Sequence, residues 1–163
     1  MKNTFYLLLF WLGLSLEVPA QAIWSADFPF AGELPSNEMT ELYQDEVGFV
    51  WIGTTNGLSR YDGYRLQTFQ TDYLHPNRLT HNHITCIAED SAYLWIGTRK
   101  GLNLIDKRTY RITTPGEAPL QTAHIRSLCS DGKSRIWIAL NDRLLESHFP
   151  YHEYTSILSL IHI

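Results

Sequence analysis

A tryptophan-centred motif that occurs three times constrains the fold more than any other feature of the sequence. Trp51, Trp95 and Trp137 lie 44 and 42 residues apart. Their surroundings read Val-Trp-Ile-Gly-Thr, Leu-Trp-Ile-Gly-Thr and Ile-Trp-Ile-Ala-Leu. A fixed period of this length is typical of repeat architectures, in which each unit buries a face against its neighbours.

The residues around the tryptophans repeat as well. An aspartate precedes each tryptophan by five or six residues: Asp45, Asp90 and Asp131. Gly57 and Gly101 follow the first two tryptophans by six residues, and Arg143 takes that place in the third unit. Glycine readily adopts positive φ, so we expect tight turns between strands at Gly57 and Gly101.

Each unit divides into short antiparallel strands, which we name a to d. The first unit predicts strands over residues 39–44, 50–54, 58–61 and 64–69, and the second over 84–88, 94–98, 102–105 and 110–113. Four short strands in about 40–45 residues are typical of a β-propeller blade. We therefore predict an all-β fold, a β-propeller with about three four-stranded blades of an incomplete ring.

The predicted domain boundaries follow from these units. Residues 23–150 form the partial propeller, with units at about 34–75, 79–116 and 121–150, and residues 151–163 stay unassigned. Closed rings contain about 4–8 blades, so we expect the chain to be a piece of a longer one. A short three-unit solenoid is the alternative interpretation.

The N-terminus differs from the rest of the sequence. Lys2 precedes an apolar run of about a dozen residues, and small residues follow at Ala20 and Ala22. This pattern predicts a signal peptide over residues 1–22 and export of the mature chain. An uncleaved anchor or a buried apolar segment is the alternative. Export would permit a disulfide between Cys86 and Cys129, although free buried thiols fit their unequal repeat positions better.

The repeated aromatic and small residues are expected to be structural. A tryptophan offers a large rigid surface to a neighbouring sheet, and Gly53 and Gly97 leave room where that neighbour approaches. The structural residues of the repeat are predicted to be Trp51, Gly53, Gly57, Trp95, Gly97, Gly101 and Trp137.

Composition and motifs exclude several kinds of function. The net charge of −4, with no basic run, argues against nucleic-acid binding by this segment. No hydrolase elbow, zinc-protease motif or Cys-x-x-Cys pair occurs, so we predict no catalytic residue, no cofactor and no enzymatic activity for this chain. Residues 97–101 lack the order and helix context of a phosphate loop. His81 and His83 alone are too few for a usual metal site.

The sequence resembles the two-component regulator propeller repeat. The first unit carries the resemblance at LPSN (34–37), QD (44–45), GFVWIGT (48–54) and NGLSRYDGY (56–64). The second unit matches over residues 82–104, and the third departs from the pattern at Ala139, Leu140 and Arg143. These departures make the turn after the third tryptophan less like the other two. The resemblance as a whole covers roughly residues 23–145.

The resemblance implies a role in signalling. In that family such repeats form the periplasmic sensor of Bacteroidetes hybrid two-component systems, anchored in the inner membrane and followed by a histidine kinase. It implies an oligosaccharide ligand released from glycans, the remaining blades and the downstream kinase as partners, and a homodimer at full length. The signalling parts of such a protein would lie outside this chain.

The propeller interpretation also predicts where a ligand binds. The b–c turns and the d–a links share one face of the ring, here called the link rim, at the mouth of the central channel. Hydrogen-bonding side chains near aromatic rings suit sugar recognition. The candidate ligand-binding residues on this rim are Asn37, His81, Asn82, His83, Arg99, Lys100 and His124. Solvent-exposed strand ends are the plainer interpretation of each one. A propeller lyase acting on polysaccharide and a protein-interaction scaffold are the alternative functions.

Overall fold

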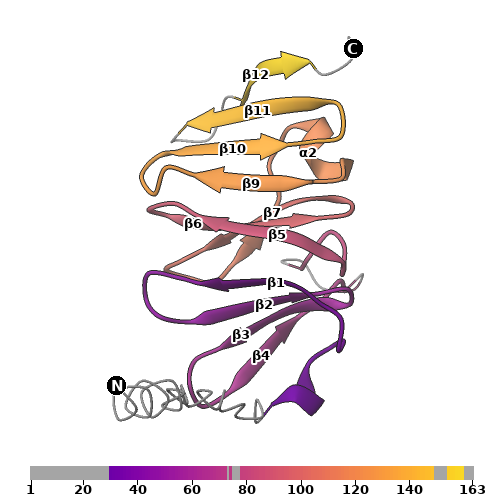
Figure 1. Cartoon of the computed structure of the whole chain (residues 1–163), viewed down its shortest axis with the longest axis vertical. Coiled ribbons are helices and arrows are strands. Elements are labelled where there is room, and N and C mark those ends of the chain that lie inside the picture. Colours follow the sequence, from indigo (N-terminus) through magenta and orange to yellow (C-terminus); the bar gives the residue numbers. More distant parts are fainter. Residues whose placement is uncertain (1–29, 73, 75–77, 149–153, 160–163) are drawn as a thin grey trace, which may run out of the picture.

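Three four-stranded antiparallel sheets make up the structure (Figure 1). This computed structural model describes residues 30–72, 74, 78–148 and 154–159. The predicted signal peptide at residues 1–22 lies outside the described residues. Within each sheet every strand pairs with its neighbours in sequence, and the sheets follow one another along the long axis of the molecule. This arrangement confirms the predicted all-β, propeller-like fold.

The strands follow the order of the repeat. The first sheet consists of β1 (Met39–Gln44), β2 (Val50–Thr54), β3 (Gly57–Tyr61) and β4 (Leu66–Phe69), after a short 3-10 helix, η1 (Ala31–Glu33). The second consists of β5 (Ile84–Glu89), β6 (Tyr93–Thr98), β7 (Gly101–Asp106) and β8 (Ile112–Thr113). The third consists of β9 (Ser127–Ser130), β10 (Arg135–Ala139), β11 (Arg143–His148) and β12 (Tyr154–Ser159), after the helix α2 (Ala118–Thr122).

Two outer strands begin later than the sequence suggests. The predicted strand at 64–69 begins at Leu66, because the Asp62 carboxylate accepts bonds from the backbone N–H groups of Tyr64 and Arg65 at 2.9 and 2.7 Å. The predicted strand at 110–113 begins at Ile112, because Tyr110 has a φ of +57°. Both starts belong to turns, which β pairing cannot include.

The third sheet extends beyond the repeat pattern. Residues 151–163 carry no match to the other units, yet β12 pairs antiparallel with β11, for example Glu146 with Thr155. Backbone hydrogen bonds make this pairing, so a fourth strand needs no repeated side chains. The segment that the sequence leaves unassigned thus supplies the outermost strand of the third sheet.

Apolar clusters join the sheets in pairs. Trp51, 1% exposed, shares one cluster with Leu94, Ile96 and Ile105 of the second sheet. Trp95 is fully buried in a second cluster, which contains Ile136 and Ile138 of the third sheet. Each tryptophan therefore faces the following sheet. Trp137, the equivalent residue of the third repeat, is half-buried and belongs to neither of these two clusters. The Arg135 guanidinium lies 5.3 Å from its ring.

The glycines of the motif mark where the following sheet comes closest. A Cβ atom on Gly53 would lie 2.8 Å from Ile84 Cγ2, and one on Gly97 would lie 2.9 Å from Ile125 Cγ2 and overlap the Cys86 sulfur. Ile84 and Ile125 occupy equivalent positions at the start of the inner strands. A side chain at either glycine would push neighbouring sheets apart.

The first two repeated aspartates, Asp45 and Asp90, cap turns and bind the tryptophans. Asp45 Oδ1 accepts bonds from the backbone N–H groups of Val47 and Phe49, while its Oδ2 accepts the Trp51 indole N–H at 2.8 Å. Asp90 binds the Trp95 indole in the same way at 2.6 Å. Each carboxylate thus ties the turn between strands a and b to the ring that packs on the next sheet.

The two cysteines are free and differ in exposure. Cys86 is buried, and desolvation raises the pKa of its thiol to about 11. Cys129 is exposed, contrary to the expectation of two buried thiols. The reason is its position opposite Trp137 in the pairing of β9 with β10, on the face that turns away from the second sheet.

Candidate functional site

The inner strands of the three sheets lie side by side, which places the link rim. β1 packs against β5, and β5 packs against β9. The link rim lies at the right in Figure 1, where β10 points and where the turns β2–β3, β6–β7 and β10–β11 lie. The links that enter β5 and β9 reach the same edge. The turns β5–β6 and β9–β10 lie on the opposite rim.

Two turns on the link rim share one construction. Thr98 Oγ1 donates to the Gly101 carbonyl at 2.6 Å and accepts the Lys100 backbone N–H at 3.1 Å. Thr54 makes the same two bonds to Gly57 and Asn56, at 2.8 and 3.1 Å. Gly57 and Gly101 have φ values of +147° and +105°, a region that favours glycine. The threonine and the glycine hold the turn, and the two residues between them point to the rim.

Amide side chains connect the first and second repeats along this rim. Asn82 Nδ2 donates to Asn56 Oδ1 at 3.2 Å, and Asn82 Oδ1 accepts the Thr71 backbone N–H at 2.7 Å. Asn56 Nδ2 in turn donates to the Pro35 carbonyl at 3.1 Å. Gln70 Nε2 donates to the Asn56 carbonyl at 2.6 Å. Asn82, a candidate ligand-binding residue, therefore joins two loops through both polar groups of its amide.

Four of the remaining candidates gather where the second and third sheets meet: His81, His83, Arg99 and His124. Arg99 donates its backbone N–H to the His83 carbonyl at 3.1 Å, which sets the β6–β7 turn beside the start of β5. Ile125 donates its N–H to the Thr98 carbonyl at 3.0 Å, which brings the neighbouring His124 to the same turn. His81 joins them, because its Nδ1 accepts the His83 backbone N–H at 3.0 Å.

The histidines of this group experience a positive field. Burial and then the Arg99 and His81 charges lower the pKa of His83, against a raising effect of Glu38, and His124 contributes to the lowering. Burial and then the Arg126 and Arg99 charges lower the pKa of His124. Both pKa values lie below the ordinary 6.5, so both rings are neutral at pH 7 and each offers one donor and one acceptor.

Asn37 and Lys100 occupy the outer parts of the rim. Both are exposed. Lys100 is the second residue of the β6–β7 turn, and Asn37 stands two residues before β1, where Asn82 stands before β5. The described contacts do not join either side chain to the histidine group.

Sequence reasoning missed two charged members of the group, Arg126 and Glu38. Arg126 Nε donates to Asn141 Oδ1 at 2.7 Å, so the residue after Ile125 reaches the β10–β11 turn. Glu38, His83 and His124 occupy equivalent positions of the repeat, directly before Met39, Ile84 and Ile125, at or just before the start of the inner strand. Alignment of the repeats at that position would have identified Glu38, because it shows where the units differ rather than where they agree.

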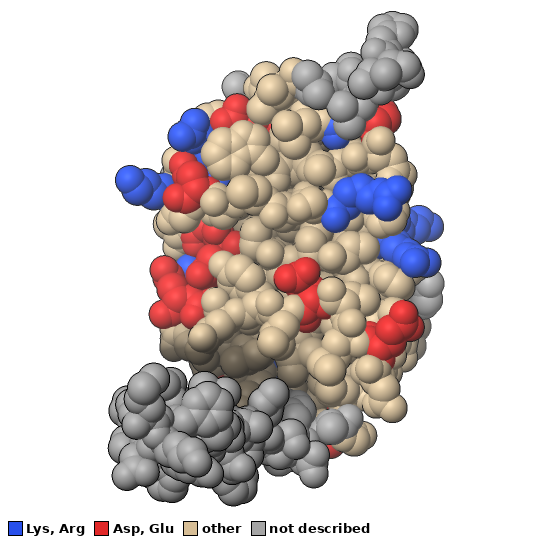
Figure 2. Space-filling view, viewed as in Figure 1, with Lys and Arg blue, Asp and Glu red and all other residues tan. Residues whose placement is uncertain are grey.

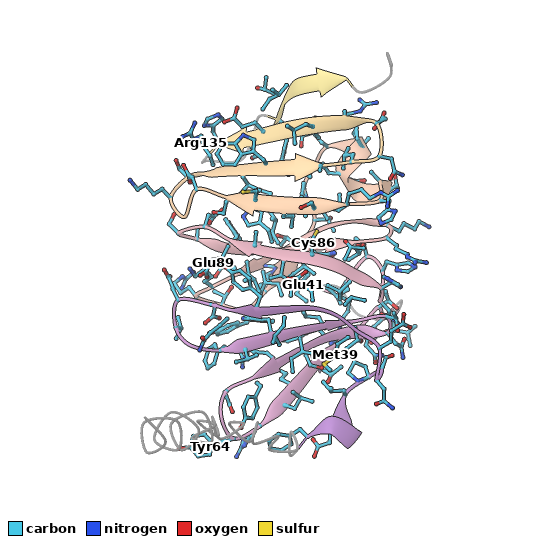
Figure 3. The ribbon with its side chains drawn as sticks, in the orientation of Figure 1. Met39, Glu41, Tyr64, Cys86, Glu89 and Arg135 are labelled. Atoms are coloured by element: carbon cyan, nitrogen blue, oxygen red, sulfur yellow. The ribbon has the colours of Figure 1, made fainter. Side chains whose placement is uncertain are left out.

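Charged side chains gather along both edges of the molecule. Figure 2 shows Lys and Arg atoms at the right-hand edge, over the ends of the second and third sheets, with acidic groups above and below them; the left-hand edge carries acidic groups and, beside the third sheet, further Lys and Arg atoms. On that opposite rim Glu46 and Glu89 pair with Lys107, with a Lys107 Nζ to Glu89 distance of 3.2 Å. Glu41 lies on the inner face between the two edges (Figure 3).

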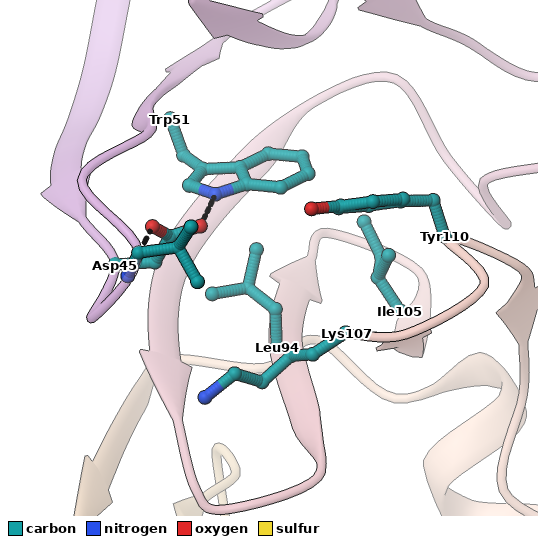
Figure 4. Close-up of a pocket in the computed structure, with 7 residues that line it drawn as sticks. Asp45, Trp51, Leu94, Ile105, Lys107 and Tyr110 are labelled. Atoms are coloured by element: carbon teal, nitrogen blue, oxygen red, sulfur yellow. Dashed lines mark hydrogen bonds between the residues drawn. The ribbon is translucent and has the colours of Figure 1, made fainter. Parts of the chain in front are cut away.

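Two hollows away from the link rim are poorer candidates. The first, lined by Asp45, Trp51, Leu94, Lys107 and Tyr110, has a volume of about 10 Å³ and fits about one water molecule (Figure 4). The second, of about 480 Å³, opens beside the outer strand β4, around Arg60 and Gln67. Arg60 is engaged there with Gln67 at 2.9 Å and with the rings of Phe49 and Tyr110.

Metal and membrane features are absent from the described part of the chain. Its His, Cys, Asp and Glu side chains form no group of three or more that could bind a metal ion. None of the helices within the described ranges is long and apolar enough to cross a bilayer.

Three stacked four-stranded sheets with adjoining inner strands define blades of a β-propeller. The family model described as "two component regulator propeller" matches residues 33–56 and 78–100. Over these two segments the chain is therefore similar to two-component regulator propeller repeats. No curated protein sequence matches the chain.

Solved structures agree with this assignment. An extracellular domain assigned to the hybrid two component system BT3049 of B. thetaiotaomicron superposes with a TM-score of 0.64 at 21% identity, over 75% of this chain and 18% of that one. The extracellular domain of BT4673 from the same organism gives 0.58 at 28% identity, over 74% and 15%. The chain thus spans less than a fifth of the length of either relative.

A lyase also shares the fold. Virginiamycin B lyase from Staphylococcus aureus superposes with a TM-score of 0.52 at 15% identity, over 73% of this chain and 40% of that one. At this identity the likeness concerns the blade architecture alone.

Proposed function

We propose that this chain is the first part of an exported sensor propeller of a hybrid two-component system, and that it binds oligosaccharides at the link rim. The observation that carries the proposal is the histidine and arginine group that two neighbouring blades build together, in repeats of the two-component regulator type. Relatives described as extracellular domains of such systems support the sensor assignment.

The chemistry of the rim suits sugars. Neutral imidazole and amide groups can donate and accept hydrogen bonds with hydroxyl groups, and guanidinium groups can donate them. His83, Arg99 and His124 lie within one small area. On this proposal the signal peptide occupies residues 1–22 and the periplasm is the site of action. The remaining blades, the kinase and a second copy of the protein are the partners.

A binding screen tests the proposal. The natural full-length protein that carries these repeats is mixed with a panel of defined neutral and charged oligosaccharides, and a rise in its melting temperature identifies binders. We expect the variant with both His83→Ala and His124→Ala to lose the shift. Arg108→Ala serves as the control, because Arg108 is exposed in the β7–β8 turn on the opposite rim.

The same samples address the two alternatives. Cleavage of a bound oligosaccharide, detected by mass spectrometry, would favour a lyase and contradict a pure sensor. A pull-down in which the protein captures other proteins from a cell extract, with no effect of any oligosaccharide, would favour a scaffold. The expected result is an oligosaccharide that binds without being cleaved and raises the melting temperature only when both histidines are present.

A further inference from the structure

We infer that the link rim selects anionic sugars, oligosaccharides that carry carboxylate or sulfate groups, over neutral ones. The inference rests on the proposed function, since it names the ligand class of the same site. Its basis is the local balance of charge where the second and third sheets meet.

Cations outnumber carboxylates at that junction. Arg99, Lys100 and Arg126 are all exposed there, on the β6–β7 turn and at the entry to β9. One carboxylate, Glu38, acts on His83 from the first blade. Asp142, in the β10–β11 turn, already binds its neighbour Arg143 at 2.6 Å. An approaching anion therefore meets Arg99, Arg126 and the two neutral rings, with Lys100 further out on the same turn.

Hydrogen bonds fix the backbone at Arg99 and the side chain of Arg126, and one of them joins the two sheets. The Arg99 N–H binds the His83 carbonyl, and the Ile125 N–H binds the carbonyl of Thr98, directly before Arg99. The bond from Arg126 Nε to Asn141 uses one of its guanidinium's five N–H donors. Planar guanidinium groups match carboxylate and sulfate oxygens in pairs, which a neutral hydroxyl cannot offer.

The histidines add a dependence on pH. His83 faces Arg99, His81, His124 and Glu38, and His124 faces Arg126 and Arg99, so protonation adds positive charge to an already positive site. A bound anion would favour the protonated rings. Affinity for an anionic sugar is therefore expected to increase as the pH falls from 7.5 to 5.5, while affinity for a neutral sugar stays constant or decreases.

Isothermal titration calorimetry of the natural full-length protein separates the possible ligands. The probes are an oligogalacturonide, which carries carboxylates only, a sulfated galactan oligosaccharide, which carries sulfates only, and a neutral galacto-oligosaccharide of equal length. We expect a charged probe to bind at least about tenfold more tightly than the neutral one, a preference that weakens as salt rises from 50 to 500 mM. Whichever of the two charged probes binds more tightly shows whether the site prefers carboxylate or sulfate groups.

Variants connect the preference to the rim. Arg99→Gln should lower the affinity for the charged probe about tenfold, as the loss of one charge-assisted contact does. The neutral probe should lose much less, because the glutamine amide still offers N–H donors to a hydroxyl group. Arg108→Gln, on the opposite rim, should change neither. Binding of the neutral probe with equal or higher affinity would overturn the anionic preference but keep the oligosaccharide sensor. Failure of all three probes and of the wider sugar panel would overturn both.

Discussion

Gly97→Ala should weaken the seam between the second and third blades. Gly97 lies on β6, opposite Cys86 in the pairing with β5. A Cβ atom on Gly97 would face Ile125, which lies two residues before β9. An alanine Cβ would overlap the Cys86 sulfur and lie 2.9 and 3.1 Å from Ile125 Cγ2 and Cβ. Neither residue can move easily, since Cys86 is buried and Ile125 is fully buried.

The expected cost follows from this crowding. Insertion of one methyl group into a well-packed interior typically costs about 1–3 kcal/mol. Because the added atom meets two buried residues from two segments, we expect about 2–3 kcal/mol for Gly97→Ala. Gly116→Ala provides the matched control, because a Cβ atom there meets no atom within 4 Å. Its effect should be less than about 0.5 kcal/mol.

Urea unfolding followed by tryptophan fluorescence measures these free energies, and a double-mutant cycle assigns the cause. Replacement of Cys86 by alanine removes the overlapping sulfur, so Cys86→Ala should recover about 1 kcal/mol or more of the Gly97→Ala loss. The residual loss reflects Ile125. Equal stability of Gly97→Ala and Gly116→Ala would refute the close approach of the blades. Strictly additive effects of Cys86→Ala and Gly97→Ala would refute the sulfur contact.

Three further predictions concern burial and charge. Trp95→Ala should cost about 3–5 kcal/mol in urea unfolding, because the ring is fully buried between two sheets; a cost below 1 kcal/mol would contradict this. Iodoacetamide at pH 7.5 should label exposed Cys129 readily and Cys86 only after unfolding, because the Cys86 thiol is buried with a pKa of about 11; mass spectrometry of digests reports both sites. His83 and His124 have pKa values below 6.5 in the folded chain, so the unfolded chain binds more protons and the unfolding free energy should fall as the pH drops below about 6.5. Replacement of both by Gln should make the unfolding free energy depend less on pH between 7.5 and 5.5. An unchanged dependence on pH would contradict this.

Much of the fold could be predicted because the repeat marks positions where packing leaves little choice. A large ring at Trp51 and Trp95 and a glycine two residues later meet the same demand in each seam, so the pattern survives in the sequence. The aspartate before each tryptophan is also plain from the sequence, but the bonds from Asp45 and Asp90 to the indole rings of Trp51 and Trp95 are not. That bond depends on a turn geometry that spacing alone does not reveal.

Features that do not repeat were harder to predict. β12 forms through backbone pairing at the sheet edge, with no residue pattern shared with β4 or β8. Arg60 lies with its guanidinium 4.3 Å from the Tyr110 ring centre, a contact between residues fifty positions apart that no local pattern suggests. Arg126 joined the candidate site for a similar reason, since its position in the other blades is occupied by threonine. A recognition surface made of such differences is visible only once the units are stacked.

In the β6–β7 turn, the groups that close the turn are distinct from the side chains that it exposes. Thr98 and Gly101 close the turn through a hydroxyl and a backbone carbonyl, and the exposed side chains of Arg99 and Lys100 take no part in that closure. These two positions can therefore change identity with little effect on the blade. A propeller built this way can acquire a new specificity by substitution of the two residues between the threonine and the glycine of such a turn, one blade at a time, while its scaffold stays the same.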